Sequence, residues 1–481
     1  MTRRTKIVAT MGPACDHPEV LEQLILAGVN VARLNFSHGT ADEHRQRAAL
    51  IRELAARHNR HVALLGDLQG PKIRISRFVD GQVELQAGDA FAFSISHPRD
   101  AGTRERVCID YPGLVTDCTV GDELLLDDGR LVMRVEQVTE DSLECRVLVG
   151  GVLSNHKGIN KRGGGLTAPA LTDKDREDIR LAAELELEYI AVSFPRDAAD
   201  MMLARQLRDE AGSSAWLVAK IERAEAVKND EVLAGLIEAS DAVMVARGDL
   251  GVEIGDAELV GIQKKIIAAA RRHNRAVITA TQMMESMITS PMPTRAEVSD
   301  VANAVLDNTD AVMLSAETAA GQYPVEAVQA MARVCLGAEK APSMRSSSHR
   351  IGRTFARQDE SVALAAMYVA NHFPGVKAII ALTESGHTPL VMTRIRSTIP
   401  VYAFASNPAT QARVALFRGV ETVPFNPSDH AKDQVCEAAI GKLLELGVVE
   451  PGDWVLLTQG EVHHNTGSTN TMKVLQVVAH S

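Results

Sequence analysis

Short and almost uninterrupted apolar runs recur along the first two-thirds of the chain, and most end in polar or charged residues. Eight of them read as strands, at residues 6–10, 29–35, 62–68, 189–194, 216–222, 242–249, 276–281 and 311–316. Their Val, Ile, Ala and Leu content is typical of strands buried on both faces. Segments with apolar residues at helical spacing separate most of the strands. This alternation predicts a parallel sheet, and the number of repeats favours a closed (β/α)₈ TIM barrel over an open doubly wound sheet.

Residues 71–168 break this rhythm. They contain alternating apolar runs punctuated by glycine, which is the pattern of antiparallel strands. The interval is too long for an ordinary strand-to-helix loop. We therefore predict an inserted all-β domain at 71–168, with the barrel divided between 1–70 and 169–341. Above the carboxyl ends of the barrel strands, such a domain would act as a lid that excludes water from the reaction.

The last part of the chain reads as a separate α/β domain. A polar stretch at 341–360 is typical of a linker, and residues 361–373 are predicted to form a helix. Apolar runs at 377–385, 401–406, 421–425 and 453–460 are predicted strands, followed by a last strand at 472–478. We therefore expect a C-terminal α/β domain at 342–481.

Composition and charge exclude several classes of protein. The 481 residues are 46% apolar and 23% charged, as in ordinary globular proteins, and the net charge of -11 argues against non-specific nucleic-acid binding. The six cysteines show no CxxC pair, so neither a disulfide framework nor a zinc site is expected. The amino terminus lacks the apolar stretch of a signal peptide, and no apolar run approaches the roughly 20 residues of a membrane span. These features predict a cytoplasmic protein without a nucleic-acid or membrane partner.

Charged residues at the ends of two successive predicted strands indicate a site for a metal and a phosphoryl group. Lys220 and Glu222 lie two residues apart on one strand and therefore face the same way. Asp249 follows the next strand and reaches the same rim if the strands are parallel. Carboxylates suit a divalent cation, and a fixed ammonium suits the phosphate beside it. Taken singly, each side chain is more typical of a surface ion pair at the end of a strand. Other predicted strands end in the same way, at Arg33, Asn35, Asp67, Ser193, Thr281 and Ser315.

The C-terminal domain contains a second loop with the features of an anion site. The loop follows a predicted strand, opens a helix, and consists of Thr383, Glu384, Ser385, Gly386, His387 and Thr388. Hydroxyls and the free N–H groups of a helix start bind phosphate, although the same arrangement also serves as an ordinary helix cap. A later polar loop contains His463 and His464, which as adjacent loop histidines are more typical of solvated residues than of metal ligands.

Seven strings of residues, in the order in which they occur, resemble the pyruvate kinase family over essentially the whole chain. They are VARLNFSHG (31–39), GDLQGPKIR (66–74), AKIE (219–222), VMVARGDLGVE (243–253), TATQMMESM (279–287), PTRAEVSDVANAVLD (293–307) and MLSAET (313–318). The resemblance implies a homotetramer that transfers a phosphoryl group from phosphoenolpyruvate to ADP. The products would be pyruvate and ATP, in the last step of glycolysis.

The resemblance also implies roles for residues of the strand-end cluster. Glu222 and Asp249 would bind Mg²⁺ or Mn²⁺, and a second Mg²⁺ would arrive with ADP or ATP. Lys220 and Arg33 would stabilise the transferred phosphoryl group, because catalysis of this reaction consists mainly of positioning and charge stabilisation.

The second half of the reaction protonates an enolate carbon. Thr281 matches the family threonine implicated in proton delivery, and we expect a relay through water and Ser315. The backbone at Gly248 and Asp249 would hold the substrate carboxylate. The remaining expected substrate contacts are Arg74 and Ser193.

Lys72 departs from the pattern of many family members. They carry glutamate at this position and bind K⁺ through residues that match Asn35, Ser37 and Asp67. The lysine ammonium would bring a positive charge close to that site, and K⁺ beside it would add repulsion. We therefore predict that activity does not depend on K⁺.

The regulatory region departs as well. The loop at 383–388 matches the family's effector-phosphate cradle. The later loop has Glu461 and histidines where some members activated by fructose 1,6-bisphosphate use arginine and tryptophan. One cradle without a second cationic clamp favours a monophosphorylated sugar or a nucleotide as the effector.

Two other functions are compatible with parts of the pattern. A Mg²⁺-dependent barrel lyase or aldolase acting through a pyruvate enolate would carry similar carboxylates, but needs neither Lys220 nor a lid. A sugar-phosphate sensor without catalysis would keep the fold, but has no use for the intact set of Arg33, Lys220, Glu222, Asp249 and Thr281.

Overall fold

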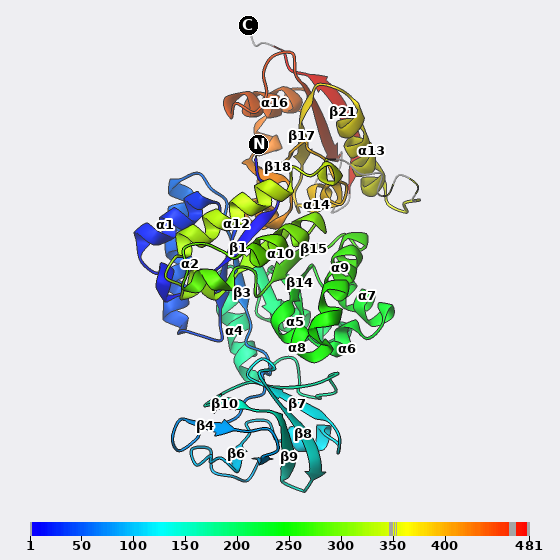
Figure 1. Cartoon of the computed structure of the whole chain (residues 1–481). Coiled ribbons are helices and arrows are strands. Elements are labelled where there is room, and N and C mark those ends of the chain that lie inside the picture. Colours follow the sequence, from blue (N-terminus) through cyan, green and yellow to red (C-terminus); the bar gives the residue numbers. More distant parts are fainter. Residues whose placement is uncertain (1, 346–349, 351, 353, 461–467, 479–481) are drawn as a thin grey trace.

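A computed structural model describes residues 2–345, 350, 352, 354–460 and 468–478. Figure 1 shows three bodies along the long axis of the molecule, with the lid domain at one end, the barrel in the middle and the C-terminal domain at the other end. The predicted fold class, a (β/α)₈ barrel with an inserted β lid and a C-terminal α/β domain, is confirmed.

Eight parallel strands close the barrel in the order in which they occur along the chain. They are β1 (Lys6–Met11), β2 (Val31–Asn35), β3 (Ala63–Asp67), β12 (Tyr189–Val192), β13 (Trp216–Ile221), β14 (Ala242–Ala246), β15 (Ala276–Ala280) and β16 (Ala311–Leu314). Strand β1 pairs with both β2 and β16, which completes the ring. Every residue of β1, β3, β12, β14, β15 and β16 is buried, as their continuous apolar sequences predict.

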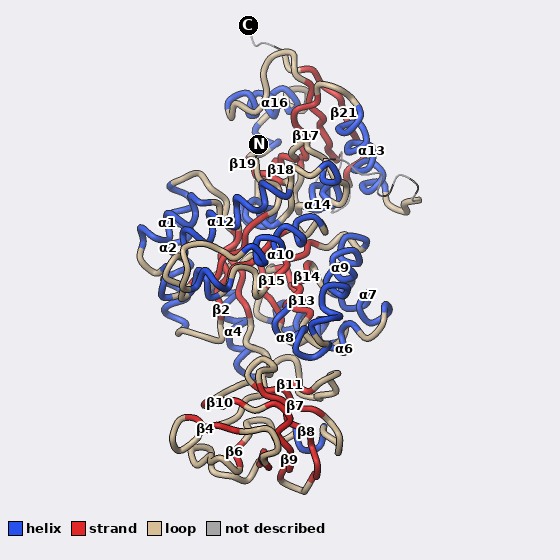
Figure 2. The backbone as a smooth tube through the Cα atoms, in the orientation of Figure 1, coloured by secondary structure: helices blue, strands red, loops and turns tan. Residues whose placement is uncertain are grey.

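Helices surround the barrel (Figure 2). The longer ones are α1 (Pro18–Ala27), α2 (Ala41–Arg57), α4 (Asp173–Glu184), α5 (Ala198–Glu210), α7 (Asp230–Ala239), α9 (Asp256–Arg272), α10 (Arg295–Leu306) and α12 (Pro324–Ala338). Thr40, Thr172 and Thr294 begin three of them with reciprocal capping boxes, which satisfy the first backbone N–H groups.

Short helices follow three strands on the side of the barrel that faces the lid: α6 (Ala224–Val227), α8 (Arg247–Ile254) and α11 (Ala316–Ala319). The strand predicted at 242–249 ends at Ala246, and the chain turns directly into α8 at Arg247. Gly248 and Asp249 therefore lie in the first turn of α8.

The lid contains a six-stranded sheet, in the order β11-β7-β8-β9-β5-β6, and a separate β10–β4 pair. The strands are β4 (Gln82–Leu85), β5 (Ala90–Ser94), β6 (Arg106–Cys108), β7 (Glu123–Leu126), β8 (Leu131–Val138), β9 (Ser142–Val149), β10 (Gly151–Ser154) and β11 (Ile159–Lys161), with the short helix α3 (Leu114–Asp117). Phe91, Phe93 and Val107 belong to a core that the lid forms by itself.

The C-terminal domain has a five-stranded sheet in the order β19-β18-β17-β20-β21, in which β21 runs antiparallel at the edge. Its strands are β17 (Val376–Leu382), β18 (Val401–Ala405), β19 (Val420–Pro424), β20 (Trp454–Gly460) and β21 (Thr469–Gln476). Its helices are α13 (Gln358–His372), α14 (His387–Thr393), α15 (Pro408–Arg413) and α16 (Val435–Glu445). Among the described residues of the whole chain, no helix is long and apolar enough to cross a membrane.

Candidate active site

Lys220 lies at the centre of a buried polar cluster at the carboxyl ends of the barrel strands. Its Nζ donates to Ser193 Oγ at 2.7 Å, and lies 3.3 Å from an Asp67 carboxylate oxygen and 3.5 Å from a Glu222 carboxylate oxygen. Burial alone would lower the pKa of Lys220, but the negative charges of Asp67 and Glu222 outweigh it and raise the pKa. The ammonium is therefore held in its charged form.

Asp67 connects Lys220 to Arg33. Arg33 Nε donates to Asp67 Oδ2 at 2.6 Å, and its Nη1 donates to Thr10 Oγ1 at 2.9 Å. Burial acts to raise the pKa of Asp67, but the charges of Arg33 and Lys220 overcome this and lower it. Arg33 and Lys220 are therefore both held in place by the ionised Asp67 carboxylate.

Glu222 follows β13 and is 1% exposed. Its Oε1 accepts a hydrogen bond from the Phe194 backbone N–H at 2.8 Å. Burial raises the pKa of Glu222 to about 7, opposed by Lys220 and reinforced by the negative charges of Asp249 and Asp67. Glu222 and Asp249, predicted to share a metal, therefore influence each other electrostatically.

The two carboxylates offer the hard oxygen ligands that a divalent cation such as Mg²⁺ prefers. The described residues contain no group of three or more His, Cys, Asp or Glu side chains that could hold a metal. A cation bound to Glu222 and Asp249 would therefore complete its shell with water or substrate oxygens, as Mg²⁺ commonly does beside phosphates. Its charge would offset the cost of ionising the buried Glu222.

Lys72 contacts the second of these carboxylates. Its Nζ lies 3.1 Å from Asp249 Oδ1 and 3.9 Å from Asp128 Oδ1. Of the other residues predicted for the monovalent-cation region, Asp67 pairs with Arg33 and Lys220, and the Ser37 backbone N–H donates to Asn35 Oδ1 at 3.2 Å. The positive charge of Lys72 therefore lies beside Asp249, one of the two carboxylates predicted to bind the metal.

Thr281 lies directly after β15 in a strained backbone. Its φ is 66° and that of Gln282 is 53°, in the left-handed region that non-glycine residues rarely adopt. The Gly248 N–H donates to Thr281 Oγ1 at 2.8 Å, and this hydroxyl donates to the Ala280 carbonyl at 2.7 Å. The Thr281 side chain is thereby fixed against the start of α8.

Arg247 supports this strained turn. Its guanidinium donates to the carbonyls of Thr281 and Gln282 at 2.7 and 3.0 Å, and pairs with Asp300 at 2.7 Å. Nothing in the sequence pattern singled out this role, since Arg247 appears there only within a matching motif.

Two predicted site residues make hydrogen bonds to groups outside the Lys220 cluster. Arg74 lies in the lid, where its Nη1 donates to the His156 carbonyl at 3.0 Å. Ser315 precedes α11, and its backbone N–H donates to Glu317 Oε2 at 2.6 Å.

The loop at 383–388 is held by its own hydroxyls. Gly386 N–H donates to Thr383 Oγ1 at 3.0 Å, and His387 N–H to Ser385 Oγ at 3.4 Å. The Glu384 carbonyl accepts from Thr410 Oγ1 at 2.6 Å, and Thr388 Oγ1 lies 2.6 Å from Thr469 Oγ1. The predicted contribution of Glu461, His463 and His464 falls outside the described residues.

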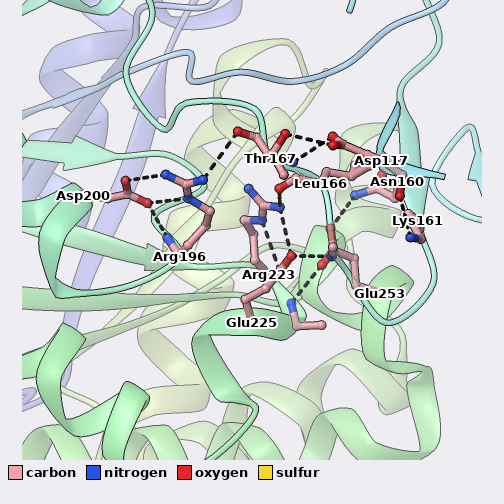
Figure 3. A network of polar contacts seen from close by, with 12 residues as sticks. Asp117, Asn160, Lys161, Leu166, Thr167, Arg196, Asp200, Arg223, Glu225 and Glu253 are labelled. Carbon is pink, nitrogen blue, oxygen red and sulfur yellow. Dashed lines mark hydrogen bonds and ion pairs between the residues drawn. The ribbon is translucent and has the colours of Figure 1, made fainter. Parts of the chain in front are cut away.

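A network of hydrogen bonds and ion pairs joins the lid to the barrel (Figure 3), and the sequence analysis did not predict it. Arg223 Nη2 donates to the Leu166 carbonyl at 2.6 Å and pairs with Glu225 at 3.1 Å. Glu225 accepts from the Gly165 N–H at 2.5 Å. The consecutive residues 163, 164 and 165 are glycines with φ of 78°, 80° and 91°, a conformation in which other residues are strained.

Glu253 of α8 extends the same network. It is 3% exposed, and its carboxylate accepts from Asn160 Nδ2 at 3.3 Å and from the Ala224 N–H at 2.8 Å. Burial raises the pKa of Glu253 to about 7. The helix that carries Asp249 is thus tied to the last strand of the lid.

Comparison with known proteins agrees with this geometry. The family pattern described as "Pyruvate kinase, barrel domain" matches residues 2–328, and "Pyruvate kinase, alpha/beta domain" matches residues 360–475. The chain is 57% identical over 477 residues to pyruvate kinase II of Salmonella typhimurium, with 99% of both chains covered. It is 55% identical to a pyruvate kinase of Haemophilus influenzae, over 98% of this chain and 97% of that one.

A solved structure of a pyruvate kinase from Cryptosporidium parvum has the same fold. It superposes with a TM-score of 0.90 at 34% identity and covers 98% of this chain and 96% of its own. The two family patterns together, and each of these relatives by itself, cover both the barrel and the C-terminal domain, so the resemblance found in the sequence is confirmed. The chain belongs to the pyruvate kinase family of phosphotransferases.

Proposed function

We propose that this chain transfers the phosphoryl group of phosphoenolpyruvate to ADP and protonates the resulting enolate to pyruvate. The observation that carries the proposal is the Lys220 ammonium, held by Ser193, Asp67 and Glu222 at the strand ends of a barrel that matches this family. Lys220 and Arg33 provide fixed positive charge for the equatorial oxygens of the phosphoryl group during transfer. Because both cations are already held in position, little reorganisation is needed when charge develops.

The divalent cation would be held by the carboxylates of Glu222 and Asp249. When bound, it would polarise the phosphoryl and carboxylate oxygens of the substrate. Glu222 and Asp249 would hold it, and the N–H groups at the start of α8, beside Gly248, would face the substrate carboxylate.

Thr281 is the candidate for the proton step. Its hydroxyl proton is directed at the Ala280 carbonyl, so delivery to the enolate requires a rotation of the side chain or a water between them. A threonine hydroxyl alone is a weak acid, so we assign Thr281 to a relay in which Ser315 is a further member.

An assay coupled to lactate dehydrogenase tests the proposal. Pyruvate should form only when phosphoenolpyruvate, ADP and Mg²⁺ (or Mn²⁺) are all present, with one ATP formed for each pyruvate. Pyruvate release without ADP would instead support the lyase or aldolase. The sensor would bind phosphorylated sugars and release no pyruvate. The family match argues against both.

We predict that activity does not depend on K⁺, because the Lys72 ammonium, which contacts Asp249, would supply the positive charge of the monovalent cation and would repel K⁺ bound close to it. With tetramethylammonium as the only monovalent cation, the rate should stay within about twofold of that in K⁺. Lys72→Glu, which restores the residue of many relatives, should create a K⁺ requirement. A collapse of the wild-type rate in tetramethylammonium that K⁺ restores would contradict the prediction.

We infer that the loop at 383–388 binds the phosphate of a monophosphorylated sugar or nucleotide activator. At sub-saturating phosphoenolpyruvate, glucose 6-phosphate, ribose 5-phosphate or AMP should activate more strongly than fructose 1,6-bisphosphate. Ser385→Ala should weaken this activation, because the Ser385 hydroxyl lies at the start of α14. Strongest activation by the bisphosphate would overturn the inference.

We also propose the assembly and domain limits that the family resemblance suggests. The chain would act as a homotetramer, with domains at 1–70 plus 169–341, 71–168 and 342–481. Light scattering should then give about four times the 51.8 kDa mass of one chain.

A further inference from the structure

Glu253 bridges the two segments of the barrel that carry the predicted metal ligands. It lies on α8 about one helical turn after Asp249. Its Oε2 accepts a hydrogen bond from the Ala224 N–H at 2.8 Å, and Ala224 comes two residues after Glu222. Because Glu253 is buried, water does not compete for this hydrogen bond. One side chain therefore joins the turn after Glu222 to the helix that carries Asp249.

The lid holds the same residue from the other side. Glu253 Oε1 accepts from Asn160 Nδ2 at 3.3 Å, and Asn160 belongs to β11, the last strand of the lid. The backbone carbonyl of Glu253 accepts from the Gly163 N–H at 3.0 Å. Figure 3 shows Glu253 close both to Asn160 and to the turn that carries Arg223 and Glu225. The lid is therefore attached to Glu253 through its side chain and through its backbone.

The chain that follows β11 packs tightly against the turn after Glu222. The Gly165 N–H donates to the Glu225 carboxylate at 2.5 Å. A Cβ added at Gly164, whose φ is 80°, would lie only 2.6 Å from the same carboxylate, so a larger residue would push the two segments apart. The backbone of the lid is therefore held directly against the turn beside Glu222.

The barrel sheet alone does not set the separation of the two carboxylates. Glu222 follows the end of β13, and Asp249 lies in the first turn of α8, so both belong to segments beyond the strands. Mg²⁺ requires its oxygen ligands at about 2.0–2.1 Å in near-ideal geometry. Groups that orient metal ligands from outside the ligand shell change metal affinity by about 10- to 100-fold. A residue that fixes both segments is therefore expected to control metal affinity.

We propose that Glu253 is a positioning residue that sets the separation of Glu222 and Asp249 and makes it depend on the position of the lid. The inference rests on the proposed metal pair. Glu253 does not bind the cation; it acts through the Ala224 N–H on one side and through α8 on the other. Metal binding and lid position are thereby coupled, and the coupling is reciprocal. Contacts that hold β11 in place strengthen metal binding, and a bound cation holds the lid.

Direct binding of Mn²⁺ to the full-length protein tests this role, measured without substrates by the loss of the electron paramagnetic resonance signal of the free ion. Glu253→Ala should weaken Mn²⁺ affinity about 10-fold or more. Glu253→Gln should stay within about threefold of wild type, because its oxygen still accepts from the Ala224 N–H and the Asn160 amide can turn to face the new amide group. An affinity of Glu253→Ala within that same range would overturn the proposal. An equal loss in both variants would also overturn it, since the charge would then act rather than the hydrogen bonds.

Glu317→Ala is the matched control. Glu317 is a buried glutamate at the same end of the barrel, and it accepts from the Met284 N–H at 3.2 Å and the Ser315 N–H at 2.6 Å, in segments other than those of the metal pair. This variant should leave Mn²⁺ affinity unchanged. Glu222→Gln tests the metal pair itself: unchanged affinity there would refute the pair. A loss in Glu222→Gln with none in Glu253→Ala would refute only the role of Glu253.

Asn160→Ala tests the contribution of the lid, because it removes the side-chain contact between β11 and Glu253. It should weaken Mn²⁺ binding in the otherwise wild-type protein. It should add little to the loss in Glu253→Ala, since two changes that act through one contact are not additive. Losses that add fully in the double variant would overturn the coupling between lid and metal.

Hydrogen exchange of the wild-type protein gives a measurement that needs no variant. Saturating Mg²⁺ should slow exchange at the amides of Gly163 and Ala224, which both donate to Glu253. The amide of Met284, which donates to Glu317, should exchange at an unchanged rate. Equal exchange at Gly163 and Ala224 with and without Mg²⁺ would overturn the proposal even if Glu253→Ala failed to fold.

Discussion

Replacing Lys220 with methionine is expected to lower kcat by about 10²- to 10³-fold, the range seen when one preorganised electrostatic group is removed from an active site. Methionine keeps the length of the side chain and removes only the charge. The Michaelis constant for phosphoenolpyruvate should change little, because Lys220 is expected to act mainly on the charge that develops during transfer. Steady-state kinetics with the coupled assay measures both constants.

A matched control is Lys265→Met, which removes a lysine of α9 that pairs with the exposed Asp230. It should retain wild-type kcat. Lys220→Arg keeps a cation but not the geometry that meets Ser193 at 2.7 Å, so its kcat should be intermediate. A Lys220→Met enzyme whose kcat lies within tenfold of wild type would show that this ammonium is not the main source of stabilisation.

Glu222→Gln should shift activation by Mg²⁺ to concentrations about 100-fold higher or more, since loss of a partner outside the ligand shell alone costs about 10- to 100-fold. The substitution preserves the size of the side chain and removes the charge that the cation would neutralise. Rate measured against Mg²⁺ concentration, at saturating phosphoenolpyruvate and ADP, gives the midpoint.

Glu188→Gln is the corresponding control for a buried glutamate. Glu188 precedes β12 at the opposite end of the barrel, where it accepts from the Leu64 N–H at 2.7 Å, and burial raises its pKa as it does for Glu222. Its Mg²⁺ midpoint should match that of wild type. An unchanged midpoint in Glu222→Gln would remove Glu222 from the metal site.

The barrel was predictable because each of its strands is buried on both faces, so apolar runs mark them directly. The strand ends were predictable for the same reason: Lys220 and Glu222 interrupt an apolar run abruptly and do come together. The end of β14 was placed too late, since the apolar pattern does not show that the chain turns into helix α8 at Arg247. Local periodicity cannot distinguish a charged strand end from the first turn of a helix.

Contacts between segments that are distant along the chain could not be predicted from the sequence. The ammonium of Lys72 contacts Asp249, which lies 177 residues further along the chain, and no local pattern indicated this contact. The tie between Glu253 and Asn160 likewise depends on how the lid meets the barrel. Such pairings follow from tertiary packing, which carries no local signature.

Arg394 gives the C-terminal domain a structural part in the barrel itself. Its side chain is 1% exposed, pairs with Asp310 just before β16, and donates to the Arg275 carbonyl at 2.7 Å just before β15. Removing the C-terminal domain would leave the buried Asp310 without its counter-charge, at the end of the barrel opposite the active site. The two units are therefore poor candidates for separate expression or for modular exchange with relatives, and a shortened chain would need Asp310 redesigned as well.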